Sequence, residues 1–170
     1  MTKALARFVR GITWASIKLG KAATWLVWSL LIVLTQEVIS RYVFNNPHGW
    51  SIEILSYHLG GIIFLTAAYA LVRESHIRMD ALWMRWSPKR QALVDAATFA
   101  CVAAYLGTLL WKGVFYARNA VIFVERYNSL AATPVGPIKV VMMIGAAMLL
   151  LQAIAFLIRD IYIVRGKTLE

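Results

Sequence analysis

The chain has 170 residues, of which 61% are hydrophobic and 15% charged, and its formal net charge is +10. Soluble domains are about 45–50% apolar and about 25% charged, so this composition excludes an ordinary soluble enzyme and indicates an integral membrane protein. The positive charge does not indicate nucleic-acid binding, because the basic residues lie between long apolar segments and not on one dense basic face.

The first 21 residues are basic and have a weak amphipathic pattern. A helix with one basic and one apolar side tends to lie in the headgroup plane of a bilayer, so we expect 1–21 to be an interfacial segment. The apolar run that follows contains Glu37 and Arg41, and no small-residue cleavage site follows a short apolar core. This pattern predicts a retained membrane span and not a cleaved signal peptide.

Four segments are long and apolar enough to cross a bilayer, which takes about 20 residues each. They are expected at about 22–44, 50–72, 91–111 and 138–158. The first two are joined by 45–49, a short link of turn-forming residues that forces an antiparallel helix hairpin. After the third span the sequence stays largely apolar as far as Val124, and it does not decide whether the helix continues there.

Between the second and third spans, the segment 76–86 has Trp on one helical face and Arg on another. A short amphipathic helix of this kind is expected to lie in the membrane interface. The side chains expected to anchor it are Arg78, Trp83, Arg85 and Trp86. The fold class predicted is therefore an all-α integral membrane protein with four transmembrane helices and short interfacial helices, in one domain over 1–170.

The distribution of basic residues predicts the orientation of the chain. The N-terminal segment, the loop after the second span and the C-terminal tail together hold 13 of the 18 Lys and Arg residues. Because cytoplasmic segments carry the excess of Lys and Arg, this places both termini in the cytoplasm. An even number of spans requires the two termini to lie on the same side, so the two arguments agree.

Charged residues inside the spans are the candidates for function, because they are costly in hydrocarbon unless paired or near water. Glu37 and Arg41 are four residues apart and can pair along one helix face. The hairpin brings Glu53 to about the depth of Arg41, so we expect one cluster of Glu37, Arg41 and Glu53. Two interpretations stay open for it: an anchor for a partner or an ion or proton site, and a clamp that holds the hairpin together.

His58 lies near the middle of the second span and is the other titratable candidate. A haem in a helical bundle usually needs a second axial ligand at matching depth, whereas His48 and His76 fall outside the spans. We therefore expect His58 to be a hydrogen-bonded packing residue, and we expect no metal or cofactor in this chain. No P-loop, Rossmann glycine pattern, H-E-x-x-H or G-x-S-x-G motif is present.

One stretch, 41–82, resembles a known family: the DctQ-like small membrane subunits of tripartite ATP-independent periplasmic (TRAP) transporters. The matching residues are Arg41, Tyr42, Phe44, Pro47, Trp50, Glu53, Arg73, His76, Ile77 and Asp80. The family often has two adjacent acids after the Trp, whereas here Glu53 follows Ile52, which weakens any claim that an acidic pair is essential.

The resemblance implies a small subunit that acts as a scaffold in the inner membrane of a bacterium. Such transporters import small organic anions, often carboxylates, with a sodium gradient. A periplasmic substrate-binding protein captures the substrate, and a large multi-span membrane subunit carries the transport path and the sodium sites. Residues expected to support the fold or the partner interface are Glu37, Arg41, Trp50, Glu53, Arg73, His76 and Asp80. No catalytic or substrate-binding residue is expected.

Two alternatives remain at this stage. The first is a self-contained small transporter or exporter that uses Glu37 as its coupling acid. The second is a membrane anchor of a redox complex with haem bound at His58. The first predicts transport without partners, and the second predicts a haem absorption band in the purified protein.

Overall fold

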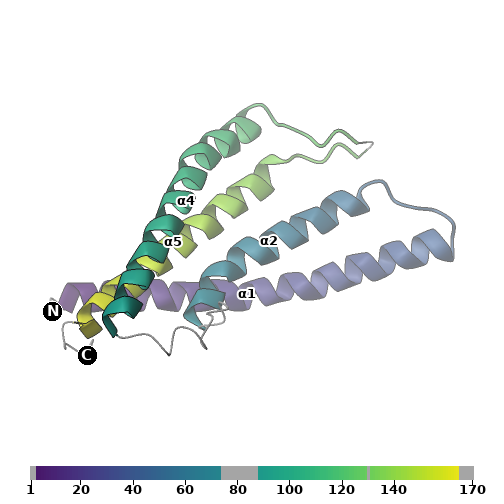
Figure 1. Ribbon diagram of the computed structural model, residues 1–170. Helices are drawn as coiled ribbons and strands as arrows, with labels where there is room; N and C mark the ends of the chain where they lie inside the picture. The colour runs from purple at the N-terminus through teal and green to yellow at the C-terminus, as the bar shows by residue number, and fades with distance from the viewer. Residues whose placement is uncertain (1–2, 74–87, 130, 165–170) are drawn as a thin grey trace.

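The computed structural model of the chain describes residues 3–73, 88–129 and 131–164, and these form four helices. They are α1 (Lys3–Tyr42), α2 (Ser51–Val72), α4 (Pro88–Ile122) and α5 (Gly136–Val164) (Figure 1). Within these ranges the extended pairing is limited to one isolated bridge between Arg126 and Pro134. All four helices are long and apolar enough to cross a membrane, which confirms the predicted all-α membrane fold.

The first helix is longer than the predicted span. α1 runs unbroken through 40 residues, so the expected segment 1–21 is not a separate helix. No proline occurs in this range, and two isolated glycines, Gly11 and Gly20, weaken a helix without ending it. At 1.5 Å per residue α1 is about 60 Å long, twice the thickness of the hydrocarbon layer. The interfacial position of its first half stays a prediction.

The third spanning helix also extends beyond the predicted span. α4 continues past Trp111 to Ile122 and contains 35 residues, which corresponds to a length of about 52 Å. The chain remains helical here because neither Pro nor a turn-forming pair occurs between Pro88 and Ile122. The apolar sequence after Trp111 therefore continues the helix as far as Ile122.

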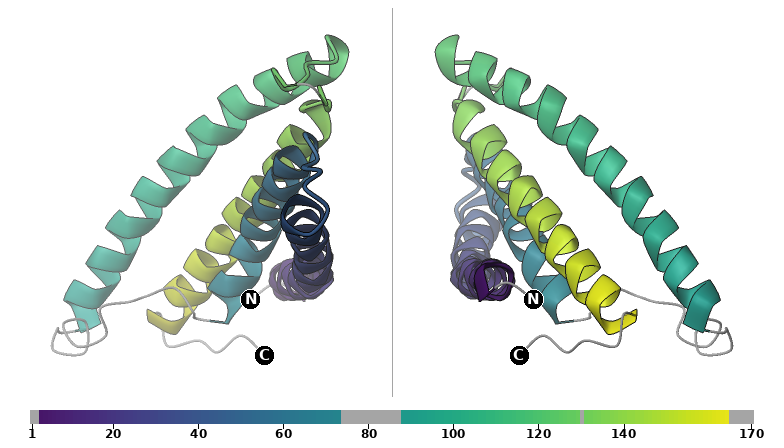
Figure 2. Two further views of the ribbon diagram at one scale, coloured as in Figure 1. Left: turned by 90° about the vertical axis from the view of Figure 1, so that its right-hand side faces the viewer. Right: turned by 90° about the vertical axis from the view of Figure 1, so that its left-hand side faces the viewer.

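The helices form two antiparallel hairpins that pack through α5. α1 contacts α2, and α5 packs against both α2 and α1, whereas α4 packs mainly on α5. Figure 2 shows α4 on the far side of α5 from α1. The described ends at Lys3 and Val164 lie at one end of the molecule, and the turns 43–50 and 123–135 lie at the other (Figure 1).

Small residues make the close contacts between helices. Gly145 of α5 lies directly on the backbone of Phe64 in α2, where an added Cβ would meet the Phe64 carbonyl carbon at 2.6 Å. Gly113 of α4 packs on the Met143 side chain of α5 in the same manner. Close approach through small residues is the usual way for helices to pack in a membrane. Many large apolar side chains are instead exposed, as expected for a surface that contacts lipid.

A polar contact holds the first half of α1 against α5. The Ser16 hydroxyl donates to Oε1 of Gln152 at 3.0 Å, and both residues are completely buried. The Gln152 amide also lies 3.5 Å from the Thr13 hydroxyl. This contact aligns the basic part of α1 with the end of α5 that leads to the C-terminus.

Candidate functional site

The candidate site lies at the turn end of the α1–α2 hairpin and is built around Glu37, which is only 6% exposed. Nη2 and Nε of Arg41 donate to Glu37 Oε1 at 2.7 and 3.2 Å. The Ser51 hydroxyl donates to Oε2 at 2.6 Å. The backbone N–H of His48 donates to the same oxygen at 3.3 Å, and His48 Nδ1 lies 3.3 Å from it. Both carboxylate oxygens are therefore occupied within the hairpin.

The turn itself is shaped to deliver these donors. Asn45 has a positive φ of 50°, a conformation that Asn tolerates better than most residues. The Ser40 hydroxyl donates to the Asn46 carbonyl at 2.7 Å, and the Asn46 N–H donates back to the Ser40 carbonyl at 2.9 Å. Trp50 precedes the first residue of α2, and its ring centroid lies 5.2 Å from that of His48. The Ser40–Asn46 hydrogen bonds and the His48–Trp50 ring contact therefore hold the turn in the conformation that surrounds the carboxylate.

Glu53 does not join this cluster, which corrects the prediction of a single group with Glu37 and Arg41. Its side chain is buried, with the residue 5% exposed, and it accepts hydrogen bonds from the Ser129 and Thr133 hydroxyls and from the Thr133 N–H at 3.0 Å. Successive residues of a helix differ by about 100° in direction. Glu53 therefore points nearly opposite to Ser51, away from α1 and towards the loop before α5.

That loop, 123–135, is folded back on itself. The Tyr127 N–H donates to the Thr133 carbonyl at 3.0 Å, and the Val135 N–H donates to the Glu125 carbonyl at 2.7 Å. The Tyr127 ring packs near Tyr57 of α2, with centroids 6.1 Å apart. Glu53 thus attaches the second hairpin to the first. Ser129 and Thr133 were not anticipated from the sequence, because no local spacing relates them to a residue 76 or 80 positions away.

Among the remaining predicted residues, the structure describes Arg73, which lies at the opposite end of α2. Arg73 directly follows α2; its Nε donates to the Tyr69 hydroxyl at 3.1 Å, and its guanidinium lies 5.5 Å from the centre of that ring. The other candidates and anchors lie outside the described residues and stay predictions: His76, Arg78, Asp80, Trp83, Arg85, Trp86 and the interfacial helix 76–86.

His58 has a partner at each ring nitrogen. Nδ1 lies 2.8 Å from the Ile54 carbonyl, which only accepts, so Nδ1 is the donor. Nε2 lies 2.9 Å from the Ser29 hydroxyl of α1. In this arrangement the imidazole links α2 to α1, and neither nitrogen points to an open position where an iron can bind. This geometry supports the packing role for His58 over the haem alternative.

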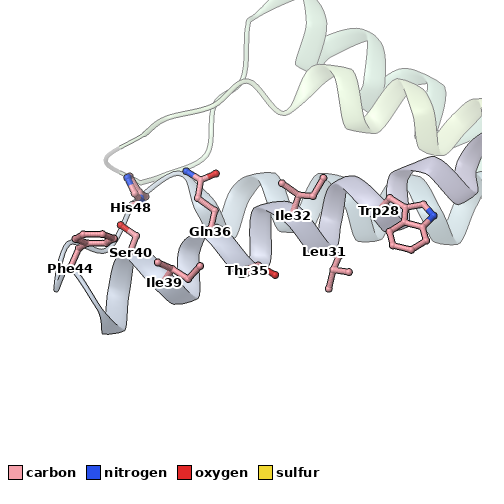
Figure 3. Close-up of a pocket in the computed structure, with 9 residues that line it drawn as sticks. All are labelled: Trp28, Leu31, Ile32, Thr35, Gln36, Ile39, Ser40, Phe44 and His48. Carbon is pink, nitrogen blue, oxygen red and sulfur yellow. The ribbon is translucent and has the colours of Figure 1, made fainter.

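A shallow groove runs along the C-terminal half of α1 (Figure 3). Its lining is Trp28, Leu31, Ile32, Thr35, Gln36, Ile39, Ser40, Phe44 and His48. Apolar side chains dominate this lining, and it includes neither Lys nor Arg. Carboxylates are usually recognised by Arg or Lys, so the groove is better suited to an acyl chain or an apolar side chain than to an organic anion.

The sequence model of one family, described as "Tripartite ATP-independent periplasmic transporters, DctQ component", matches residues 30–162 of the chain. The chain belongs to the DctQ family. The matched region contains the C-terminal part of α1, all of α2 and α4, and most of α5, so both carboxylate sites lie within it. No curated protein and no solved structure matches the chain significantly.

Membership of the DctQ family makes this chain the small membrane component of a TRAP transporter, a class of transporter and not of enzyme. The family implies association with a large membrane subunit and with a substrate-binding protein. For a DctQ subunit, the two buried glutamates are best understood by what they attach: Glu37 closes the α1–α2 hairpin, and Glu53 joins that hairpin to the loop before α5.

Proposed function

We propose that this DctQ chain is the scaffold subunit of a sodium-driven importer of small organic anions. In this proposal the large membrane subunit carries the substrate and sodium, and a periplasmic binding protein delivers the substrate. The small subunit lies in the inner membrane of a bacterium with both termini in the cytoplasm, and gives the moving parts of the large subunit a fixed reference.

The observation that carries the proposal is the state of the two buried carboxylates. An acid that couples transport to an ion gradient must take up and release a cation during each cycle. Glu37 instead accepts hydrogen bonds from Arg41, Ser51 and His48, and Glu53 from Ser129 and Thr133. Releasing either carboxylate would break the contacts that hold the outer end of the fold, so a structural role is favoured over the coupling role.

The proposal is tested by purifying the chain from its native membrane in mild detergent and identifying what accompanies it. A stoichiometric large multi-span protein, together with sodium-dependent uptake of an organic anion in vesicles containing both subunits and the binding protein, is the expected result. A chain that purifies alone and transports by itself would contradict the scaffold role. Loss of coupling in Glu37→Gln would then identify the self-contained transporter. A haem absorption band in the purified chain would instead identify the redox anchor.

A further inference from the structure

A row of polar side chains runs along α4 on a face that the rest of the described chain leaves uncovered. The row, called here the α4 polar seam, consists of Thr98, Cys101, Tyr105, Thr108 and Lys112, all of which are exposed. The gaps between successive members are 3, 4, 3 and 4 residues. Alternating gaps of 3 and 4 keep side chains on one side of a helix, and this is the spacing with which one helix packs along another.

The seam is distinct from the face that α4 uses inside this chain. Leu106, Ala117 and Ala120 are buried, and Gly113 packs on Met143 of α5. These residues lie about 80° to 140° around the helix from the middle of the seam, given 100° per residue. α4 thus has one row in use against α5 and a second row with the same kind of spacing that is exposed.

The position of Tyr105 makes this exposure costly in lipid. It lies 17 residues from both Pro88 and Ile122, the ends of α4, which is about 25 Å along the helix in each direction. A hydrocarbon layer about 30 Å thick therefore contains Tyr105 when α4 crosses it centrally. The residue is 68% exposed. A phenol hydroxyl in hydrocarbon has no hydrogen-bond partner unless another protein supplies one.

The exposed surface of α4 also has a largely apolar side. Trp111, Val114 and Val121 are large, apolar and exposed, and they lie on a different side of the helix from the seam. This apolar side suits acyl chains.

We propose that the α4 polar seam is the contact surface for a transmembrane helix of another membrane protein, and that this helix presents a carboxylate to Lys112 and a hydrogen-bond acceptor to Tyr105. Lys112 has only donors to offer, so its complement is an acceptor, and a carboxylate also balances its charge. The partner is the large membrane subunit, an identification that rests on the proposed function.

A second copy of this chain fits the seam poorly. Two copies inserted in the same membrane have the same orientation, so their α4 helices would meet in parallel with each residue opposite its own counterpart. That arrangement places Lys112 against Lys112 at one depth, and like charges directly opposed are unfavourable in a poorly solvated contact. The seam has no acidic residue to offset them.

The test places a photoreactive benzoylphenylalanine at Tyr105 in the complete complex and identifies its cross-links after irradiation in the native membrane. The matched control carries the same residue at Trp111, another exposed aromatic position on α4 about 120° away around the helix. Cross-linking of the large subunit from position 105, with lipid adducts from position 111, is the expected result.

The other outcomes separate this inference from the proposed function. If the large subunit co-purifies but position 105 reacts only with lipid or with a second copy of the chain, the seam assignment is wrong and the scaffold proposal stands. If no large subunit co-purifies with the unmodified chain, the proposed function fails first, and the identity of the partner fails with it.

A second measurement tests the charge at the seam. Lys112→Met keeps the length of the side chain but removes its charge, and it should lower retention of the large subunit on purification by about tenfold or more, as expected when one member of a desolvated charge pair is lost. Arg118→Met removes an exposed positive charge from a different side of α4 and should leave retention unchanged. Equal retention in the two variants would overturn the carboxylate partner of Lys112.

Discussion

A carboxylate that leaves water needs hydrogen-bond donors in its place, and the two buried glutamates obtain them in different ways. Glu37 uses a neighbour on its own helix, Arg41, together with donors from the turn that follows. Glu53 uses a loop that is distant in the sequence. Losing either side chain should therefore weaken a different connection, and the two effects can be measured separately.

At Glu37, the loss of the acceptor should matter more than the loss of the arginine. Glu37→Ala leaves the Ser51 hydroxyl and the His48 N–H without their acceptor and should lower the melting temperature in detergent by several degrees. Arg41→Ala should cause a smaller decrease, because Ser51 and His48 still hold the carboxylate and the Arg41 side chain is 45% exposed. The exposed neighbour Gln36, changed to Ala, is the control. A larger effect in Arg41→Ala than in Glu37→Ala would contradict this order.

At Glu53, the expected consequence is local. Glu53→Ala removes the acceptor for Ser129 and Thr133, so the loop 123–135 should detach from α2 and trypsin should cleave after Arg126 more rapidly. Glu125→Ala is the control, because it breaks an exposed ion pair with Lys139 at 2.5 Å, and such pairs contribute little. The time course of limited digestion, followed by mass spectrometry, gives the comparison. Equal cleavage rates in the two variants would show that Glu53 does not hold the loop.

At the scale of the helices, contact between α2 and α5 depends on the absence of a side chain at Gly145. An added methyl group would collide with the Phe64 backbone, which cannot move without separating the helices. Gly145→Ala should therefore destabilise the fold by about 1–3 kcal/mol, the usual cost of overpacking. Gly107→Ala is the matched control, because a Cβ there meets nothing within 4 Å and alanine favours a helix. The melting temperatures of both variants test this prediction. An unchanged melting temperature for Gly145→Ala would contradict the close contact between Gly145 and Phe64.

The attachment of the first half of α1 to α5 can also be measured. The Ser16 hydroxyl donates a buried hydrogen bond to the Gln152 side-chain oxygen at 3.0 Å. Single and double changes to Ala should give a coupling energy of about 0.6 kcal/mol and no more than about 1.7 kcal/mol, the average and the largest value found for hydrogen bonds between membrane helices. Unfolding titrations of the four proteins supply this value. Strict additivity of the two single changes would mean that the bond contributes nothing to the position of α1.

At the scale of the whole molecule, the positions of the termini and turns predict the orientation of the chain in the membrane. Lys3 and Val164 lie at one end of the molecule and both turns at the other (Figure 1). Together with the excess of Lys and Arg in the terminal segments, this arrangement predicts cytoplasmic termini and turns facing the periplasm. A reporter enzyme that is active only in the periplasm should be inactive when fused at either terminus and active when inserted after Tyr127. Activity at the C-terminus would reverse the predicted orientation.

Much of the architecture was predictable because it depends on local patterns. Apolar runs of about 20 residues predicted four membrane helices, and the short link at 45–49 predicted the α1–α2 hairpin. The pair Glu37 and Arg41, present at 2.7 Å, follows from their spacing of four residues. Motifs near Trp50 and Glu53 were sufficient to suggest the DctQ family, which the family match shows.

The sequence alone therefore determined the membrane class, the number of spans and the contacts between residues close in the chain. Only the tertiary structure decided that Glu53 binds Ser129 and Thr133 and not Arg41, and that the seam on α4 is left uncovered by the rest of the described chain. The physical reason is that local patterns show which face of a helix is polar, whereas the partner of that face depends on how the hairpins cross. That crossing is set by close contacts such as Gly145 on Phe64, which no local spacing reveals.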